Sequence, residues 1–245
     1  MRNITVTSVR TLRTLGVVLF LLPVAAGVVA LAFVAPIPQP ESYHHFADQR
    51  RLLGIPNFWD VVSNLPFAVA GVLGLRAFRD LASRLLFAGV FLTAFGSAWY
   101  HWAPDSPRLV WDRLPITVAV MSLVALVIHA AFGAKAGRAL LLPLVAAGLF
   151  SVAWWRMEGD LRAYVLVQFA PMVMLPVALI FFDLPAPREL WIAVVLYGLA
   201  KVAELTDREI YSAFVLSGHT LKHLLAGLST YWLYLWRRAA DTTFG

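Results

Sequence analysis

Three histidines have the side-chain type and the spacing to hold a metal ion. His219 and His223 are four residues apart, which puts both imidazoles on one face of a helix, and His101 lies at the end of another apolar segment. Three neutral imidazoles with an open fourth position are typical of a hydrolytic zinc site. The chain has no cysteine, so no thiolate favours a softer or redox-active metal. We therefore expect Zn2+ as the cofactor.

Two further polar residues accompany the histidines. Ser97 precedes His101 by four residues and shares its helix face, while Asp112 lies at the start of the next apolar segment. A carboxylate and a hydroxyl beside a metal provide a proton acceptor and a hydrogen-bond donor for hydrolysis. The alternatives are a small residue for close helix packing at Ser97, and an interfacial ion pair of Asp112 with Arg113 or Arg108.

Other interpretations of the histidines stay open. Histidines at helix ends can hydrogen-bond headgroups or backbone carbonyls, and a pair can bind haem, although the spacing of His219 and His223 suits one small ion better. His129 has no partner histidine and is interpreted as a hydrogen-bonded core residue. His44 and His45 fall in a long loop, where a surface position is favoured over a supporting role at the site.

The elements that position these residues are predicted to be transmembrane helices. Of the 245 residues, 60% are hydrophobic and only 14% are charged, and the mean hydropathy is +0.75, which excludes a water-soluble domain of this size. Crossing a bilayer takes roughly 20 apolar residues. Eight such segments are predicted, at about 15–35, 58–75, 85–102, 114–132, 139–155, 163–182, 190–206 and 216–236.

Charge sets the expected orientation. With both termini in the cytoplasm, the inner connections are rich in arginine and the outer connections hold most of the acids, so the five candidate residues gather at the outer end of the bundle. The net charge of +6 is then a feature of membrane topology and gives little reason to expect nucleic acid. The lack of cysteine and the preference for arginine over lysine favour a bacterial inner membrane, with the site toward the periplasm.

Three regions are expected along the chain. Residues 1–56 form a transmembrane anchor and an outer loop, 57–238 form the helical core, and 239–245 form a short cytoplasmic tail. The apolar run from Leu15 to Pro36 is longer than the core of a cleavable signal, so it is interpreted as a retained anchor. No soluble domain and no internal repeat are predicted.

The order Ser97-x-x-x-His101, Asp112, His219-x-x-x-His223 resembles the alkaline ceramidases and their wider superfamily of seven-helix membrane hydrolases, which includes the adiponectin-receptor-like proteins. The resemblance covers about Asn57 to Trp236. It implies an all-α bundle with a seven-helix ceramidase-like core plus one extra N-terminal transmembrane helix. The segment 57–64 is similar to the start of the first ceramidase helix, and 111–115 favours the ceramidase branch over the receptors.

The resemblance also implies an activity and its residues. Zinc bound by His101, His219 and His223 would activate water for cleavage of a lipid amide, with Asp112 moving the proton and Ser97 donating to the oxyanion. Ceramide or a related N-acyl lipid, entering sideways from the bilayer, is the expected substrate, and no protein partner is inferred. The rival interpretation is a receptor or sensor in which zinc is structural. A transporter with a polar site at the membrane midplane agrees less well with the sequence, since the polar cluster lies at one end of the bundle.

The chain departs from the family at its calcium-binding loop. Where the ceramidases have a glutamate, this chain has Asn57, and only Glu41 and Asp48 are nearby. A hard cation needs several oxygen ligands, so the sequence gives little support for calcium. Asp48, Arg51 and Asn64 are instead interpreted as braces of the site. Glu204, Asp207 and Lys201 are predicted either to support the site or to form an ion-pair network.

Overall fold

The protein is a bundle of helices in the computed structural model, which describes residues 6–244. Within that range there is no β-strand, and only an isolated bridge pairs Leu52 with Ile55. The elements are α1 (Val6–Phe33), the short 3-10 helix η1 (Glu41–His44), α2 (Phe58–Val62), α3 (Leu65–Ala77), α4 (Leu81–Trp102), α5 (Ser106–Phe132), α6 (Ala134–Glu158), α7 (Arg162–Phe181), α8 (Pro187–Leu205), α9 (Asp207–Ala213), α10 (Gly218–Ala239) and α11 (Asp241–Phe244).

Six helical segments of the described chain are long and apolar enough to cross a membrane. They are Arg10–Phe33, Phe58–Ala77, Leu81–Trp102, Ser106–Phe132, Ala134–Glu158 and Arg162–Phe181. The remaining two predicted segments are also helical and form α8 and α10, but both carry charges within their apolar stretches. The all-α class and the membrane character are thus confirmed.

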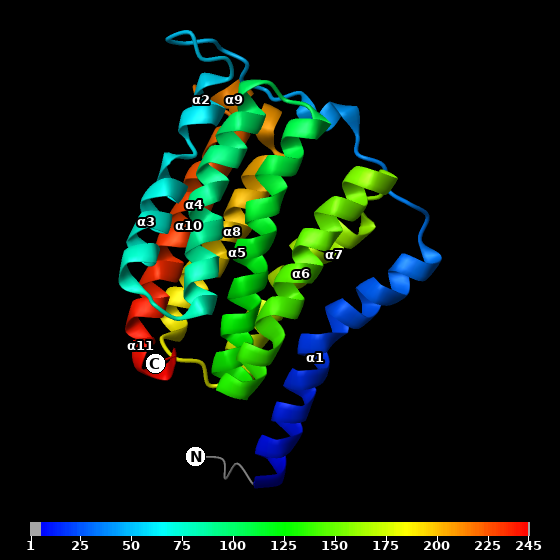
Figure 1. The fold of residues 1–245 in the computed structure, drawn as a ribbon, viewed down its shortest axis with the longest axis vertical. Helices are drawn as coiled ribbons and strands as arrows, with labels where there is room; N and C mark the ends of the chain where they lie inside the picture. Colours follow the sequence, from blue (N-terminus) through cyan, green and yellow to red (C-terminus); the bar gives the residue numbers. More distant parts are fainter. Residues whose placement is uncertain (1–5, 245) are drawn as a thin grey trace.

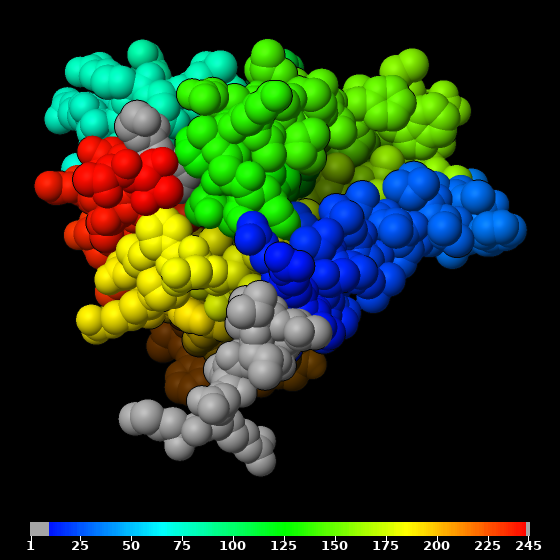
Figure 2. Space-filling model, turned by 90° about the horizontal axis from the view of Figure 1, so that it is seen from below, coloured from blue at the N-terminus to red at the C-terminus, as the bar shows by residue number. Residues whose placement is uncertain are grey.

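The helices run roughly along one direction, and α1 lies at the margin of the bundle (Figure 1). Helix α4 packs between α3 and α5, and α10 packs against α8 and α3. Seen from below, α1 covers one side of the other helices and does not enter them (Figure 2). Its main attachment is to α7, and the buried ring of Phe20 makes edge contacts with Phe132 and Phe182.

Small residues let the helices approach closely beside the predicted site. A Cβ atom at Gly96 of α4 would lie 2.0 Å from the carbonyl oxygen of Trp111, so α4 and α5 touch where Ser97 and Asp112 face each other. Gly218 is equally constrained, since its Cβ would lie 2.2 Å from the carbonyl oxygen of Ala203. These two glycines fix the distances between the elements that carry the site residues.

Helices α5 and α10 begin at the upper end of the bundle, and a side chain caps the first turn of each. The Asp105 carboxylate accepts a hydrogen bond from Arg108 N at 2.7 Å at the start of α5. Ser217 Oγ accepts one from Thr220 N at 3.0 Å at the start of α10. Because N-terminal amides of a helix lack partners in the helix itself, such caps determine where it begins. Asp112 and His219 therefore occur in the first two turns of their helices.

Candidate metal centre

The three predicted ligands meet at the upper end of the bundle. His101 comes from the last turn of α4, and His219 and His223 come from the first turns of α10. The three ring centres are each 4.8 Å from the other two, and one ligand atom from each residue lies within 4.8 Å of the others. All three side chains are buried.

The donor set and its spacing suit a tetrahedral metal ion. His101 Nε2 and His219 Nε2 are 3.3 Å apart, which is long for a hydrogen bond between nitrogens. Two imidazole nitrogens bound at about 2.0–2.1 Å with a tetrahedral angle are about 3.3 Å apart, and this is the distance that a shared zinc ion requires. A divalent ion such as zinc is thus compatible with these residues, although histidine alone does not select zinc over other borderline metals.

A hydroxyl group orients His223. Ser63 Oγ lies 2.9 Å from His223 Nδ1 and donates its proton to the carbonyl oxygen of Asp60 at 3.2 Å. Since a hydroxyl has one proton, Ser63 accepts from the Nδ1–H of His223. This leaves the lone pair on Nε2 free for a metal, which is the arrangement that supporting hydrogen bonds impose on metal-binding histidines.

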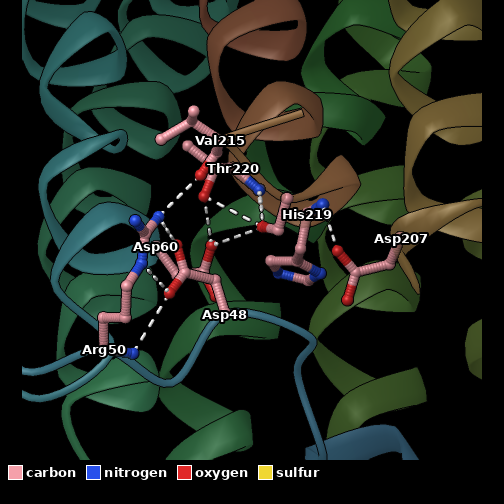
Figure 3. A network of polar contacts seen from close by, with 8 residues as sticks. Asp48, Arg50, Asp60, Asp207, Val215, His219 and Thr220 are labelled. Carbon is pink, nitrogen blue, oxygen red and sulfur yellow. Dashed lines mark hydrogen bonds and ion pairs between the residues drawn. The ribbon is translucent and has the colours of Figure 1, made fainter. Parts of the chain in front are cut away.

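Asp60 joins α2 to the beginning of α10. Its Oδ1 accepts hydrogen bonds from Thr220 Oγ1 at 2.7 Å and from Ser217 Oγ at 3.4 Å. The side chain is fully buried, and its Oδ2 has no hydrogen-bond partner within residues 6–244. The contact holds the first turn of α10, which carries His219, against α2 (Figure 3).

Asp207 holds His219 from the opposite side. Its Oδ1 accepts from the backbone N of His219 at 2.8 Å (Figure 3). Its Oδ2 accepts from the backbone N of Ala47 at 2.9 Å. A carboxylate that accepts two backbone N–H groups fixes both segments. Asp207 therefore supports the site and ties the loop after α1 to α10.

Asp48 and Arg50 close the loop over the start of α10. The Asp48 carboxylate accepts from Arg50 Nε at 2.8 Å, and Arg50 Nη2 donates to the carbonyl oxygen of Val215 at 2.6 Å (Figure 3). Burial raises the pKa of Asp48, but the hydrogen bonds and charge of Arg50 outweigh it and hold the pKa below its ordinary value. The arginine that braces Asp48 is thus Arg50. The prediction named Arg51 and was wrong, because the Arg51 side chain is exposed and Arg50 is the residue that donates to Asp48.

The same loop covers the metal ligands. The ring centre of Phe46 lies 4.6 Å from that of His101 and 4.4 Å from that of His219. His44 is buried, with Nδ1 at 2.9 Å from Tyr100 Oη and Nε2 at 3.1 Å from Ser106 Oγ, and burial lowers its pKa. The prediction of a surface position was wrong for His44, which anchors the loop, and right for the exposed His45.

Asparagines at the start of α2 and α3 complete the support. Asn57 adopts a left-handed conformation with φ 44°, and its Nδ2 donates to the carbonyl oxygen of His101 at 2.8 Å. Asn64 Nδ2 donates to the carbonyl oxygen of Asp60 at 2.8 Å, as expected of a brace. The contact of Asn57 was not predicted; an asparagine before a short helix, where a left-handed conformation is tolerated, is a signal that could have indicated it.

Ser97 and Asp112 face each other on one cavity below the histidines. They line a cavity of about 120 Å³ together with His223, and the Ser97 hydroxyl interacts with the Asp112 carboxylate. The proposed ion pairs of Asp112 do not form: Arg108 pairs with Asp105, and Arg113 donates to Gln39 Oε1 at 2.7 Å. Asp112 is thereby left facing the cavity.

A second, more apolar cavity of about 200 Å³ continues below the first. Six lining residues belong to both cavities: Val90, Ala119, Val120, Gln168, Tyr197 and Thr230. The lower cavity extends along α4 to Leu86 and along α10 to Leu233. From Ser97 to Leu86 a helix rises about 16 Å at 1.5 Å per residue, so the two cavities provide an elongated space with one polar end.

An ion-pair network lies on the wall of the upper cavity. Glu204 Oε2 is 2.9 Å from Lys201 Nζ, and Glu204 Oε1 is 2.6 Å from Lys222 Nζ. Of the two roles considered for Lys201 and Glu204, the network is the one that is formed, and it links α8 to α10. Lys222, between the two histidines in the sequence, was not singled out.

Comparison with known proteins does not assign the chain to a family. No family model matches the chain, and no curated protein matches it. The function must therefore be inferred from the site.

Proposed function

We propose that the protein is a zinc-dependent membrane hydrolase that cleaves the amide bond of ceramide or a related N-acyl lipid and releases a fatty acid. The observation that carries the proposal is the buried triangle of His101, His219 and His223 directly above a cavity that contains Ser97 and Asp112. A structural zinc site is closed by four protein ligands. Here the protein provides three histidine ligands, and the side chains on the open side, Ser97 and Asp112, can take part in proton transfer and hydrogen bonding.

Each residue has a distinct task in the proposed reaction. When bound, zinc lowers the pKa of water from 15.7 toward about 7 and polarises a carbonyl oxygen. The Asp112 carboxylate takes a proton from the attacking water and delivers it to the leaving amine nitrogen. Once Asp112 holds that proton, it no longer needs the hydrogen bond from Ser97, and the Ser97 hydroxyl donates to the oxygen that gains negative charge. Water adds to the carbonyl carbon, the C–N bond breaks, and the products are a fatty acid and an amine.

The lower cavity suits the acyl chain. It is lined mainly by apolar side chains from α4, α5, α7, α8 and α10, and it opens into the polar cavity through shared residues. A lipid amide bound with its chain downward would present its carbonyl group at the upper end, beside Ser97. An apolar lining lets the acyl chain move from the bilayer into the cavity without loss of its apolar surroundings.

The proposed topology is a seven-helix ceramidase-like core, from α2 and α3 through α10, with α1 as an additional N-terminal span. The arginine-rich connections favour cytoplasmic termini and a site near the outer surface of a bacterial inner membrane. In the structure the first turn of α1 and the short α11 lie at the end of the bundle opposite the metal ligands (Figure 1). Reporter fusions at both ends test this orientation.

The proposal is tested on protein purified in a neutral detergent. Zinc is counted per chain, and fatty acid release is measured from a panel of N-acyl lipids. We expect one zinc per chain and release by the wild type, and neither in His219→Ala. His45→Ala is the matched control, because His45 is an exposed histidine of the loop, and it retains both properties.

Two results would count against the hydrolase. Stoichiometric zinc without release from any lipid amide would favour a receptor or sensor in which zinc is structural. Release that persists in His219→Ala without bound metal would remove the metal from the reaction.

A further inference from the structure

The two half-buried lysines beside the candidate metal centre have more N–H donors than their protein partners satisfy. The chain has only three lysines against seventeen arginines, and two of the three, Lys201 and Lys222, line the upper cavity. Each ammonium has three N–H donors. Each makes one side-chain hydrogen bond among the described residues, and both of these bonds go to Glu204. Four charged donors are thus left at the cavity wall.

Glu204 is the one carboxylate that pairs directly with these lysines among the described residues. The side chains of Lys201, Lys222 and Glu204 are each about one-fifth exposed or less, so bulk water solvates them poorly. Two ammonium groups share the Glu204 carboxylate, and Asp112, a second acid on the same cavity, makes no ion pair with either of them. The Lys201 ammonium also lies 5.7 Å from the ring centres of Phe169 and Tyr197, which stabilise a cation without neutralising it.

An ion pair that only joins two helices would not need two lysines for one glutamate. One lysine and one glutamate suffice to join α8 to α10, and Lys222 with Glu204 already does so. Lys201 lies on the same helix as Glu204 and adds no connection between helices. A second half-buried cation costs desolvation energy that an anionic ligand would offset.

The position of the cluster limits what the ligand can be. Lys222 directly precedes the ligand His223, and both line a cavity of only about 120 Å³. An anion bound by the lysines would therefore lie within a few bonds of an amide bound beside Ser97. The acyl chain continues into the lower cavity, so the anion belongs to the amine side of the amide.

We propose that Lys201 and Lys222 bind an anionic group on the amine portion of the substrate. The substrate class is then N-acyl lipids with an acidic headgroup, such as N-acyl amino acids, and a neutral ceramide is a poorer substrate. Carboxylate and phosphate share the required chemistry, since both accept charge-assisted hydrogen bonds from ammonium groups. This inference rests on the proposed hydrolase function and specifies its substrate.

A pair of lipids that differ only in charge tests the inference. N-palmitoylglycine has a carboxylate next to the amide, and N-palmitoylglycinamide has a neutral group of the same shape. We expect kcat/KM of the wild type to be at least about tenfold higher for N-palmitoylglycine, because hydrogen bonds to charged groups contribute about 1.5–3 kcal/mol. N-palmitoyl phosphoethanolamine tests phosphate as the source; the faster of the two acidic lipids identifies the preferred anion.

Lys201→Gln is the informative variant, because Glu204 keeps its partner Lys222 and the link between α8 and α10 stays intact. We expect the ratio between the acidic and the neutral lipid to fall toward one. Lys222→Gln should lower the same ratio. Lys135→Gln, at an exposed lysine at the start of α6, should leave it unchanged. A ratio at or below one in the wild type, or one that Lys201→Gln does not move, would overturn the proposal.

Binding separates this inference from the hydrolase proposal. Displacement of a fluorescent fatty acid gives the Kd of both glycine lipids without requiring hydrolysis. If neither lipid is cleaved but N-palmitoylglycine binds at least about tenfold more tightly in the wild type than in Lys201→Gln, the anion site stands and the hydrolase fails. If both lipids bind and are cleaved equally well, the hydrolase stands and the anion site fails.

Discussion

Cations with little solvent exposure lie at both ends of the bundle, where Arg237 is buried and Lys201 and Lys222 are half-buried, and their surroundings differ. At the lower end, Arg237 of α10 donates from Nε to Ser83 Oγ at 2.7 Å and from Nη2 to Asp80 Oδ2 at 3.0 Å. Its guanidinium also lies 4.6 Å from the ring centre of Phe78. The residues lining the cavities reach down α10 only to Leu233, so Arg237 is packed into protein.

The upper cations face a cavity instead. Lys201 and Lys222 share one carboxylate and keep donors on the cavity side. Both clusters contain charge with little solvent exposure, but only the upper one combines it with space, spare donors and three converging imidazoles. A buried charge alone therefore does not indicate a site; the difference lies in what its remaining donors face.

The largest expected effect on stability belongs to the lower end. Replacing Arg237 with methionine leaves Asp80 without its buried partner, and loss of one member of such a pair costs about 3 kcal/mol. We expect Arg237→Met to melt at a distinctly lower temperature in detergent, while the fraction that remains folded still binds zinc. Arg238→Met, at the exposed neighbouring arginine, should melt like the wild type. Loss of zinc from folded Arg237→Met would contradict the separation of the two ends.

Ser97→Ala should affect the reaction and not the fold. Removing one donor to the oxyanion lowers kcat by about 100-fold, and we expect zinc content and melting temperature to be retained. The matched control is Ser122→Ala, since the Ser122 side chain is buried on α5 with no hydrogen-bond partner for its hydroxyl among the described residues. Loss of zinc in Ser97→Ala would show that the serine supports the metal site.

Gly96→Ala tests the contact between α4 and α5. The added Cβ would lie 2.0 Å from the carbonyl oxygen of Trp111, and overpacking of this kind costs about 1–3 kcal/mol. We expect a lower melting temperature and slower amide cleavage, because separation of the helices moves Asp112 away from Ser97. At Gly198 a Cβ would meet nothing within 4 Å, so Gly198→Ala should melt like the wild type. Equal melting of the two variants would rule out a tight contact at Gly96.

The smallest effect is expected from Asp207→Asn. The amide cannot accept from the backbone N–H groups of both Ala47 and His219, so one segment is released. Supporting contacts of this kind change metal affinity by 10–100-fold, and we expect about tenfold weaker zinc binding in a competition assay with a chelator. Glu209→Gln, at an exposed acid on the same short helix, is the control. Unchanged zinc affinity in Asp207→Asn would show that His219 is held by its helix alone.

Local spacing predicted that His219 and His223 lie side by side, since an interval of four residues puts both on one helix face whatever surrounds the helix. The helical segments also followed from length and hydropathy. The supporting contacts followed only in part: Asp48 and Asn64 were expected as braces, but the contact between Ser63 and His223 was not. Ser63 is 160 residues away from His223 in the chain, and no local pattern reports such a contact.

The same limit explains the wrong assignments. Nothing in the sequence distinguishes Arg50 from Arg51 or His44 from His45, because neighbouring loop residues differ only in the direction that the folded loop gives them. Lys222 was overlooked for the related reason that its partner Glu204 belongs to another helix. Residues that lie side by side on one helix can be predicted from their spacing, whereas contacts between different elements can be identified only once the fold is known.

Two of the three metal ligands come from α10, which begins at Gly218. A polypeptide is synthesised from its N-terminus, so these two candidate ligands are made more than one hundred residues after His101. Until then the nascent protein offers His101 alone. A metal ion that needs all three histidines could therefore be captured only after the helices α1 to α8 have been synthesised.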